Sequence, residues 1–203
     1  MKALAAIVLL VAVPAALASH PSKLRSQQAN LDRDRALETI VGVEDVSSDH
    51  SVWRAHVRIV DRCRGRARRY VVLDGYRQLV AGDPVQADGR GANEVLAVLR
   101  EAAAEGEARL VRLVPRRGRC ATTRRLFRYV AAGTDRPAPE QELTHFDVEV
   151  VELQAGYAGR ELRVTELFQS PPMLSSIHRE RLYRYLRPRD AYVLYATNTH
   201  RVP

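Results

Sequence analysis

Apolar and polar residues alternate with a period of two over several stretches of the chain, which is the pattern of β-strands with one buried face. The clearest stretch is 51–63, in which the odd positions are mostly apolar and the even positions are mostly cationic. The two sets are Trp53, Ala55, Val57, Ile59 and Cys63 against Arg54, His56, Arg58, Arg62 and Arg64. The pattern predicts a strand with one face in the core and a row of cations on the other.

Further segments are rich in β-branched and aromatic residues and are bounded by turn formers, which also predicts strands. They are 39–46, 70–73, 108–114, 145–153, 160–167 and 191–197. Two other segments predict helices. The first, 92–105, has good helix formers with Val95 and Leu99 on one side and Gly106 as a stop. The second, around 175–186, has Ile177 on an apolar side opposite a cationic side, and we expect it to pack on its own sheet rather than on a membrane.

These elements divide the chain into successive parts. We expect a signal peptide at 1–18, a polar lead-in at 19–37, a β-rich unit with one helix at 38–132, a linker at 133–141 rich in turn formers, and a second β unit with a helix at 142–203. Segment 57–73 aligns with 148–164 without a gap. Either two β-hairpins share their alternation by chance, or a duplication has produced two small barrels.

The second unit carries a resemblance. A strand, a glycine turn and a strand at 146–164 are followed by Leu186-Arg-Pro-Arg-Asp190 and an aromatic-rich strand. This order is similar to the secreted OB-type barrels of the tissue-inhibitor-of-metalloproteinases and netrin-like families. The resemblance implies a mainly β fold with one or two helices, an α+β arrangement of one OB-like small β-barrel or two in tandem. Those inhibitors act through an N-terminal cysteine, which is missing near Ser19, so the resemblance extends to architecture only.

The first residues combine Lys2 with a short apolar run and an Ala-Leu-Ala motif, the features of a signal peptide cleaved near Ala18/Ser19. No later segment offers the roughly 20 apolar residues of a membrane-spanning helix. We therefore expect a secreted or periplasmic protein without a transmembrane segment. In such a compartment Cys63 and Cys120 are expected to form one disulfide, the alternatives being a reactive thiolate and an intermolecular bridge.

The chain has 32 basic residues and a net charge of +8, and only Lys2 and Lys23 are lysines. A disulfide between Cys63 and Cys120 would gather ten arginines, called the Arg cluster below: Arg62, Arg64, Arg66, Arg68, Arg69, Arg116, Arg117, Arg119, Arg124 and Arg125. The planar guanidinium binds phosphate, sulfate and carboxylate groups in a bidentate manner. The alternative is a solvated face neutralised by acids on other strands: Asp147, Glu149, Glu161 and Glu166.

The cluster predicts an anionic partner: an anionic glycan, a lipid head group or an acidic protein surface. Nucleic acid is not expected, because the basic runs lack interleaved aromatic residues. His145, Asp147 and Glu149 are the only metal candidates, and their spacing of about 6.6 Å along one strand face favours ion pairs with arginines instead. Neither G-x-S-x-G nor H-E-x-x-H is present, and the adjacent residues 49–51 cannot form a Ser-His-Asp relay.

The sequence thus predicts an exported, non-enzymatic binding protein that uses an Arg-rich face for an anionic ligand or surface and needs no cofactor. The alternatives are a structural or accessory protein that docks on another exported protein, and a hydrolase with an unfamiliar site.

Overall fold

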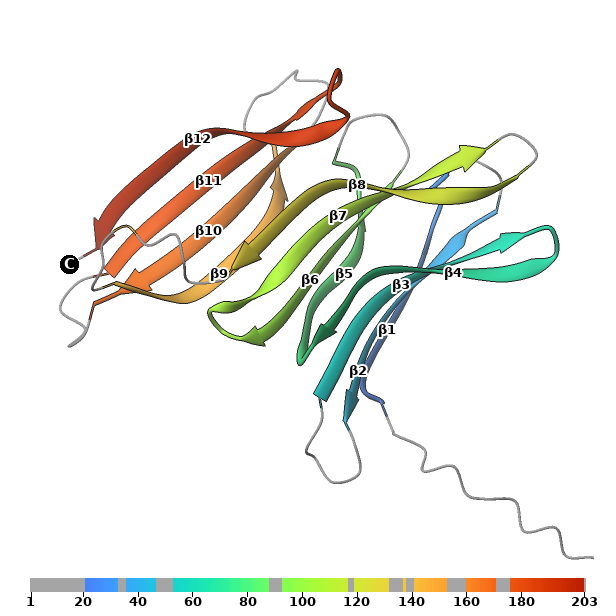
Figure 1. The fold of residues 1–203 in the computed structure, drawn as a ribbon, viewed down its shortest axis with the longest axis horizontal. Helices are drawn as coiled ribbons and strands as arrows, with labels where there is room; N and C mark the ends of the chain where they lie inside the picture. Colours follow the sequence, from blue (N-terminus) through green and yellow to red (C-terminus); the bar gives the residue numbers. More distant parts are fainter. Residues whose placement is uncertain are drawn as a thin grey trace, which may run out of the picture.

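The structure is a computed structural model that describes residues 21–32, 36–46, 53–87, 93–116, 119–131, 137, 141–152, 160–170 and 176–202. The predicted signal peptide and the 49–51 trio lie outside these residues. The described residues form three antiparallel sheets of four strands each, and in every sheet the strands lie side by side in chain order (Figure 1). The molecule is therefore a series of three meanders.

Sheet A contains β1 (Pro21–Ala29), β2 (Glu38–Val46), β3 (Trp53–Cys63) and β4 (Arg66–Tyr76). Sheet B contains β5 (Gln78–Val85), β6 (Glu94–Ala102), β7 (Glu105–Arg116) and β8 (Arg119–Ala131). Sheet C contains β9 (Glu142–Val151), β10 (Glu161–Gln169), β11 (Ser176–Leu186) and β12 (Ala191–Val202). The polar segment 19–37 thus contains a strand, β1.

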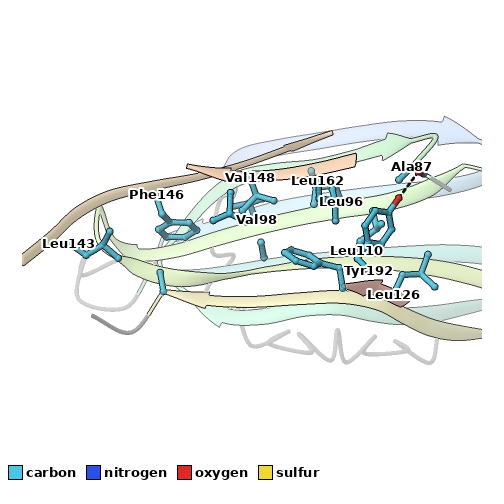
Figure 2. Packing of buried hydrophobic residues seen from close by; sticks show 14 of the residues in the cluster. Ala87, Leu96, Val98, Leu110, Leu126, Leu143, Phe146, Val148, Leu162 and Tyr192 are labelled. Atoms are coloured by element: carbon cyan, nitrogen blue, oxygen red, sulfur yellow. Dashed lines mark hydrogen bonds between the residues drawn. The ribbon is translucent and has the colours of Figure 1, made fainter. Parts of the chain in front are cut away.

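Sheet B is the central layer and is buried on both faces. Along β6, Val95 and Leu99 pack into the core shared with sheet A, whereas Leu96 and Val98 pack into the core shared with sheet C. Figure 2 shows the second core, where Phe146 of sheet C lies among the apolar side chains of sheet B. Two hydrophobic cores, A–B and B–C, therefore hold the three layers together.

Both predicted helices are wrong. Within the described residues, the first segment contains β6, a turn at 103–104 and the start of β7, and the second forms β11 from residue 176 onward. A strand buried on both faces has no polar alternation, so the apolar run of β6 resembles a buried helix. In β11 the inward positions include the buried Arg179. A charged residue at a core position interrupts the alternation of apolar and polar residues by which a strand is recognised.

The expected OB-like barrel is also wrong, because the three sheets are open and none of them closes on itself.

The aligned segments 57–73 and 148–164 correspond to different places in their meanders. The first covers β3 and β4, the last two strands of sheet A, while the second runs from β9 into β10, the first two strands of sheet C. The similarity is that of two hairpins. The division of the chain at 133–141 stays a prediction; this segment separates sheets B and C, which share a core.

Candidate functional site

Three hairpin turns rich in arginine lie at corresponding places in the three meanders. The β3–β4 turn contains Arg64 and Gly65, the β7–β8 turn lies between Arg116 and Arg119, and the β11–β12 turn spans 187–190. Arg64 and Gly65 both have positive φ values, 53° and 74°, as a tight two-residue turn requires. The β3–β4 and β7–β8 tips project together from one side of the molecule (Figure 1). We call the part of the molecule formed by these three turns the Arg-rich end.

A disulfide joins the first two turns. Cys63 is the last residue of β3 and is bonded to Cys120 in β8, with the two Cα atoms 5.4 Å apart. This confirms the predicted pairing. Next to it, the hydroxyl of Tyr70 donates a hydrogen bond to the carbonyl oxygen of Ala121 at 2.9 Å. The arginines of sheets A and B are therefore held together on a cross-linked support.

Asp190 anchors the third turn. Its carboxylate accepts hydrogen bonds from Arg112 at 3.1 Å and from Tyr185, and lies 2.7 Å from Arg124. Partial burial opposes ionisation of this carboxyl group, but Tyr185 and the two guanidinium groups outweigh burial and hold its pKa below the ordinary range. The β11–β12 turn, with Arg187 and Arg189 exposed, is thereby fixed against β7 and β8.

The loops that join the first and second strands of each sheet also contact one another. The amide of Asn93 donates to the carbonyl oxygen of Asn30, and the amide of Arg160 donates to that of Ala87. A buried glutamate begins the second strand of each sheet: Glu38, Glu94 and Glu161. Glu38 accepts a hydrogen bond from the amide of Leu31, and Glu94 accepts one from the amide of Ala87. In both cases the amide lies seven residues upstream of the glutamate.

Sequence reasoning missed this threefold glutamate. The detectable signal was a glutamate that opens a β-branched or apolar run after a loop in each third of the chain. Because Glu38 and Glu94 each accept a hydrogen bond from a loop amide, they help to hold the loops next to the Arg-rich end in place. Arg187 and Arg189 were missed as well, because the sequence did not connect their turn with the two cysteine-containing ones.

The structure shows where the Arg cluster lies. All its described members are exposed, and Arg117 lies outside the described residues. The acids expected to neutralise the cluster have other partners: Asp147 lies 4.0 Å from Arg100, Glu149 2.7 Å from Arg163, and Glu166 2.6 Å from Arg179, while Glu161 is hydrogen-bonded to Tyr195. Within the described residues, a group of cluster members forms no ion pair with a carboxylate: Arg62, Arg66, Arg68, Arg69, Arg116, Arg119 and Arg125.

Arginines face each other across β7 and β8 at three positions: Arg109 and Arg128, Arg112 and Arg124, and Arg116 and Arg119. Like charges in such cross-strand pairs are destabilising. A carboxylate lies between the members of the first two pairs. Glu107 lies 2.5 Å from Arg109 and 2.8 Å from Arg128, and Asp190 bridges the second pair. The third pair is at the tip, and no described carboxylate bridges it.

A pocket of about 290 Å³ opens beside the disulfide. Its lining includes Arg62, Arg64 and Arg119 together with the carboxylates of Asp32 and Asp61. Asp61 is buried on the inner side of β3. The pocket therefore offers guanidinium donors for an anionic group and carboxylate acceptors for hydroxyl or amide groups of the same ligand.

The metal candidates are not brought together with further ligands. His145, Asp147 and Glu149 are exposed on β9, where Glu149 is ion-paired with Arg163. Within the described part of the chain, no group of three His, Cys, Asp or Glu side chains is arranged to hold a metal ion. Among the described residues, no helix is long and apolar enough to cross a membrane.

Comparisons of the chain with protein-family models, curated proteins and solved structures find no match.

Proposed function

We propose that this protein binds an anionic polysaccharide through the Arg-rich end. The observation that carries this proposal is the cross-strand pair Arg116 and Arg119 at the tip of β7–β8. Two equivalent pairs on the same hairpin are each bridged by an internal carboxylate, and this exposed pair has no such partner among the described residues. A carboxylate, sulfate or phosphate group of a ligand supplies the missing bridge.

The neighbourhood of this pair favours several contacts with one polyanion. The disulfide brings the β3–β4 turn, with Arg62 and Arg66 exposed, next to the β7–β8 tip. An extended chain with regularly spaced charged groups can contact both turns, and each guanidinium can form two parallel hydrogen bonds to one such group.

The pocket favours a carbohydrate over a lipid surface. Asp32 and Asp61 line it together with the arginines, and carboxylates accept hydrogen bonds from the many hydroxyl groups that a polysaccharide carries beside its charged groups. Surface-bound membrane proteins also bury apolar side chains in the bilayer. Of the large exposed apolar residues in the described part of the chain, Leu37 alone lies in a loop at the Arg-rich end. This end therefore offers little apolar surface to a bilayer.

Export is part of the proposal. The intramolecular disulfide is the kind of bond that forms in an oxidising compartment, where extracellular or envelope polysaccharides are available as ligands. We propose that the segment 1–18 directs the chain there.

The test is the double variant R116Q/R119Q on a column of immobilised heparin, used as a model sulfated polysaccharide. The salt concentration that elutes the protein should fall clearly below that of the wild type. Because the variant also removes a like-charge repulsion, its melting temperature without ligand should be unchanged or slightly higher. A loss of binding with a retained fold therefore identifies the pair as a contact site.

The matched control is R54Q/R77Q, which removes the same charge from two exposed arginines outside the Arg-rich end. We expect its elution to stay close to that of the wild type. If both variants elute at the same salt concentration, retention depends on net charge alone and the proposal is wrong. Binding to phosphatidylglycerol vesicles in place of heparin would also contradict it.

A further inference from the structure

The edges of the three sheets differ in how they are protected against pairing with another strand. Edge strands are usually blocked by charged side chains, proline or β-bulges. Five of the six edge strands carry such residues: Arg25 on β1, Arg66 and Arg68 on β4, Asp83 and Pro84 on β5, Arg124 and Arg128 on β8, and Asp147 and Glu149 on β9. The sixth edge strand, β12, has a β-bulge at Tyr195 and a charged residue only near its end, Arg201, so most of its length has no charged side chain.

β12 is long and uncharged over most of its length. From Tyr192 to Thr199 it reads Tyr-Val-Leu-Tyr-Ala-Thr-Asn-Thr, which combines β-branched and aromatic residues of high strand propensity. One of its edges pairs with β11 from Ala191 to Val202, and no described strand pairs with the other edge. It forms the outer margin of sheet C, far from β1 (Figure 1).

Exposed apolar side chains accompany this edge. Leu194 and Tyr195 are 43% and 39% exposed, and both are among the few large apolar residues on the described surface. Tyr195 is held in place by Arg184, whose guanidinium lies 5.2 Å from the ring centroid. The residues 197–201 that follow are exposed without interruption. The edge is therefore ordered, accessible and without charged residues over its central part.

We infer that β12 pairs antiparallel with β12 of a second copy of this chain, joining two C sheets into one continuous sheet. The side chains of β12 are complementary to themselves. When two antiparallel copies are centred on Asn198, Thr197 of one lies opposite Thr199 of the other, and threonine pairs favour cross-strand contact.

The charges determine the direction of pairing. His200 and Arg201 are at the end of β12. A parallel arrangement would place Arg201 directly opposite its copy, whereas the antiparallel arrangement directs the two cationic ends away from each other. An isologous contact of this kind closes as a dimer, and no further copy can add to it.

The dimer would direct the two Arg-rich ends in opposite directions, because the β11–β12 turn precedes β12 in both copies. The protein would then bridge two anionic chains. This consequence rests on the proposed function, but the dimer itself does not, so the two can fail separately.

The test is sedimentation equilibrium of the purified protein over a concentration series, combined with hydrogen–deuterium exchange. We expect a mass approaching twice that of the chain, and amides of β12 whose protection increases with concentration. In T197K/T199K the like charges face each other across the interface, so the protein should be monomeric with an unchanged melting temperature.

The control is T123K/T165K, which places the same two substitutions on β8 and β10, away from the β12 edge. It should remain dimeric. A wild-type protein that is monomeric at every concentration would overturn the inference. So would a dimer that persists in T197K/T199K, because it must use another surface. Heparin binding by the monomeric variant reports on the proposed function independently.

Discussion

Sheet B packs on sheet A through aliphatic side chains, and on sheet C through aliphatic side chains together with aromatic ones. The A–B core contains alanine, valine, leucine and isoleucine, with Tyr70 and Tyr76 at its margin. The chain has three phenylalanines, and all of them lie in the B–C core: Phe127, Phe146 and Phe168. The two interfaces therefore differ in the side chains that fill them, although the same strands of sheet B contribute to both.

The aliphatic interface allows close approach of its layers. A methyl group added at Gly42 would lie 2.9 Å from Leu79, and one added at Gly82 would lie 3.2 Å from Val57. The disulfide joins these two sheets at the Arg-rich end. Small side chains and a covalent bond thus hold sheets A and B together.

The aromatic interface depends on ring contacts and buried charge instead. Phe127 meets Tyr183 edge-to-face at 5.0 Å, and Arg100 lies 5.0 Å above the Phe146 ring. No disulfide is present between sheets B and C, since the two cysteines of the chain are used between A and B. The comparison predicts that sheet C is the layer that separates first when the protein is destabilised.

The largest effect is expected for Phe146→Ala. Phe146 is fully buried, and truncation of such a ring costs about 3–5 kcal/mol. Hydrogen–deuterium exchange should show loss of protection in β9 to β12, with sheets A and B still protected by their disulfide. Leu99→Ala, a truncation on the A–B side of β6, is the matched control and should lower protection in sheets A and B more than in sheet C. If Phe146→Ala also unfolds all sheets together, the two interfaces form one cooperative unit.

Removing the disulfide tests the A–B interface. The double variant C63A/C120A releases a loop constraint over 57 residues, which corresponds to about 4 kcal/mol in the chain-entropy model. We expect a lower midpoint in urea denaturation and weaker retention on heparin, because the two Arg-rich turns are no longer fixed together. Protection within sheet C should change least. An unchanged midpoint would show that packing alone holds the A–B interface.

The strands of the outer sheets could be predicted more readily than those of the central sheet. Segment 51–63 alternates clearly, because β3 has one buried and one more exposed face, and the structure contains this strand. Sheet B has a core on each face, so β6 has no polar side and was predicted as a helix. The pairing of Cys63 with Cys120 was correct because two cysteines in one chain leave few alternatives.

The site was predictable as a set of charges but not as a geometry. The Arg cluster followed from the two cysteine-containing segments. Which arginines are neutralised depends on cross-strand register: Glu107 and Asp190 bridge two facing pairs, and no spacing in the sequence shows that Asp190 approaches Arg112 and Arg124. His56 was expected at the surface and is buried, and burial together with the charge of Arg58 lowers the pKa of its imidazole.

The smallest expected losses of stability come from one tyrosine at each interface. In both interfaces the tyrosine hydroxyl group of one sheet donates a hydrogen bond to a buried glutamate of the next sheet. Tyr76 of sheet A donates to Glu107 at 3.1 Å, and Tyr129 of sheet B donates to Glu166 at 2.6 Å. Burial and the neighbouring Glu166 carboxylate raise the pKa of Tyr129 above its ordinary value.

The matched substitutions are Tyr129→Phe and Tyr76→Phe, each of which deletes one hydroxyl group and leaves the ring. Arg179, which also contacts Glu166, is buried, whereas the side chains of Arg109 and Arg128 beside Glu107 are 29% and 49% exposed. Water can therefore replace the hydroxyl of Tyr76 but not that of Tyr129. We expect losses of about 1.5–2 kcal/mol for Tyr129→Phe and about 0.5–1 kcal/mol for Tyr76→Phe in urea denaturation. Equal losses would mean that the two charged clusters are equally accessible to water, and the B–C interface would then owe its distinct character to the aromatic rings alone.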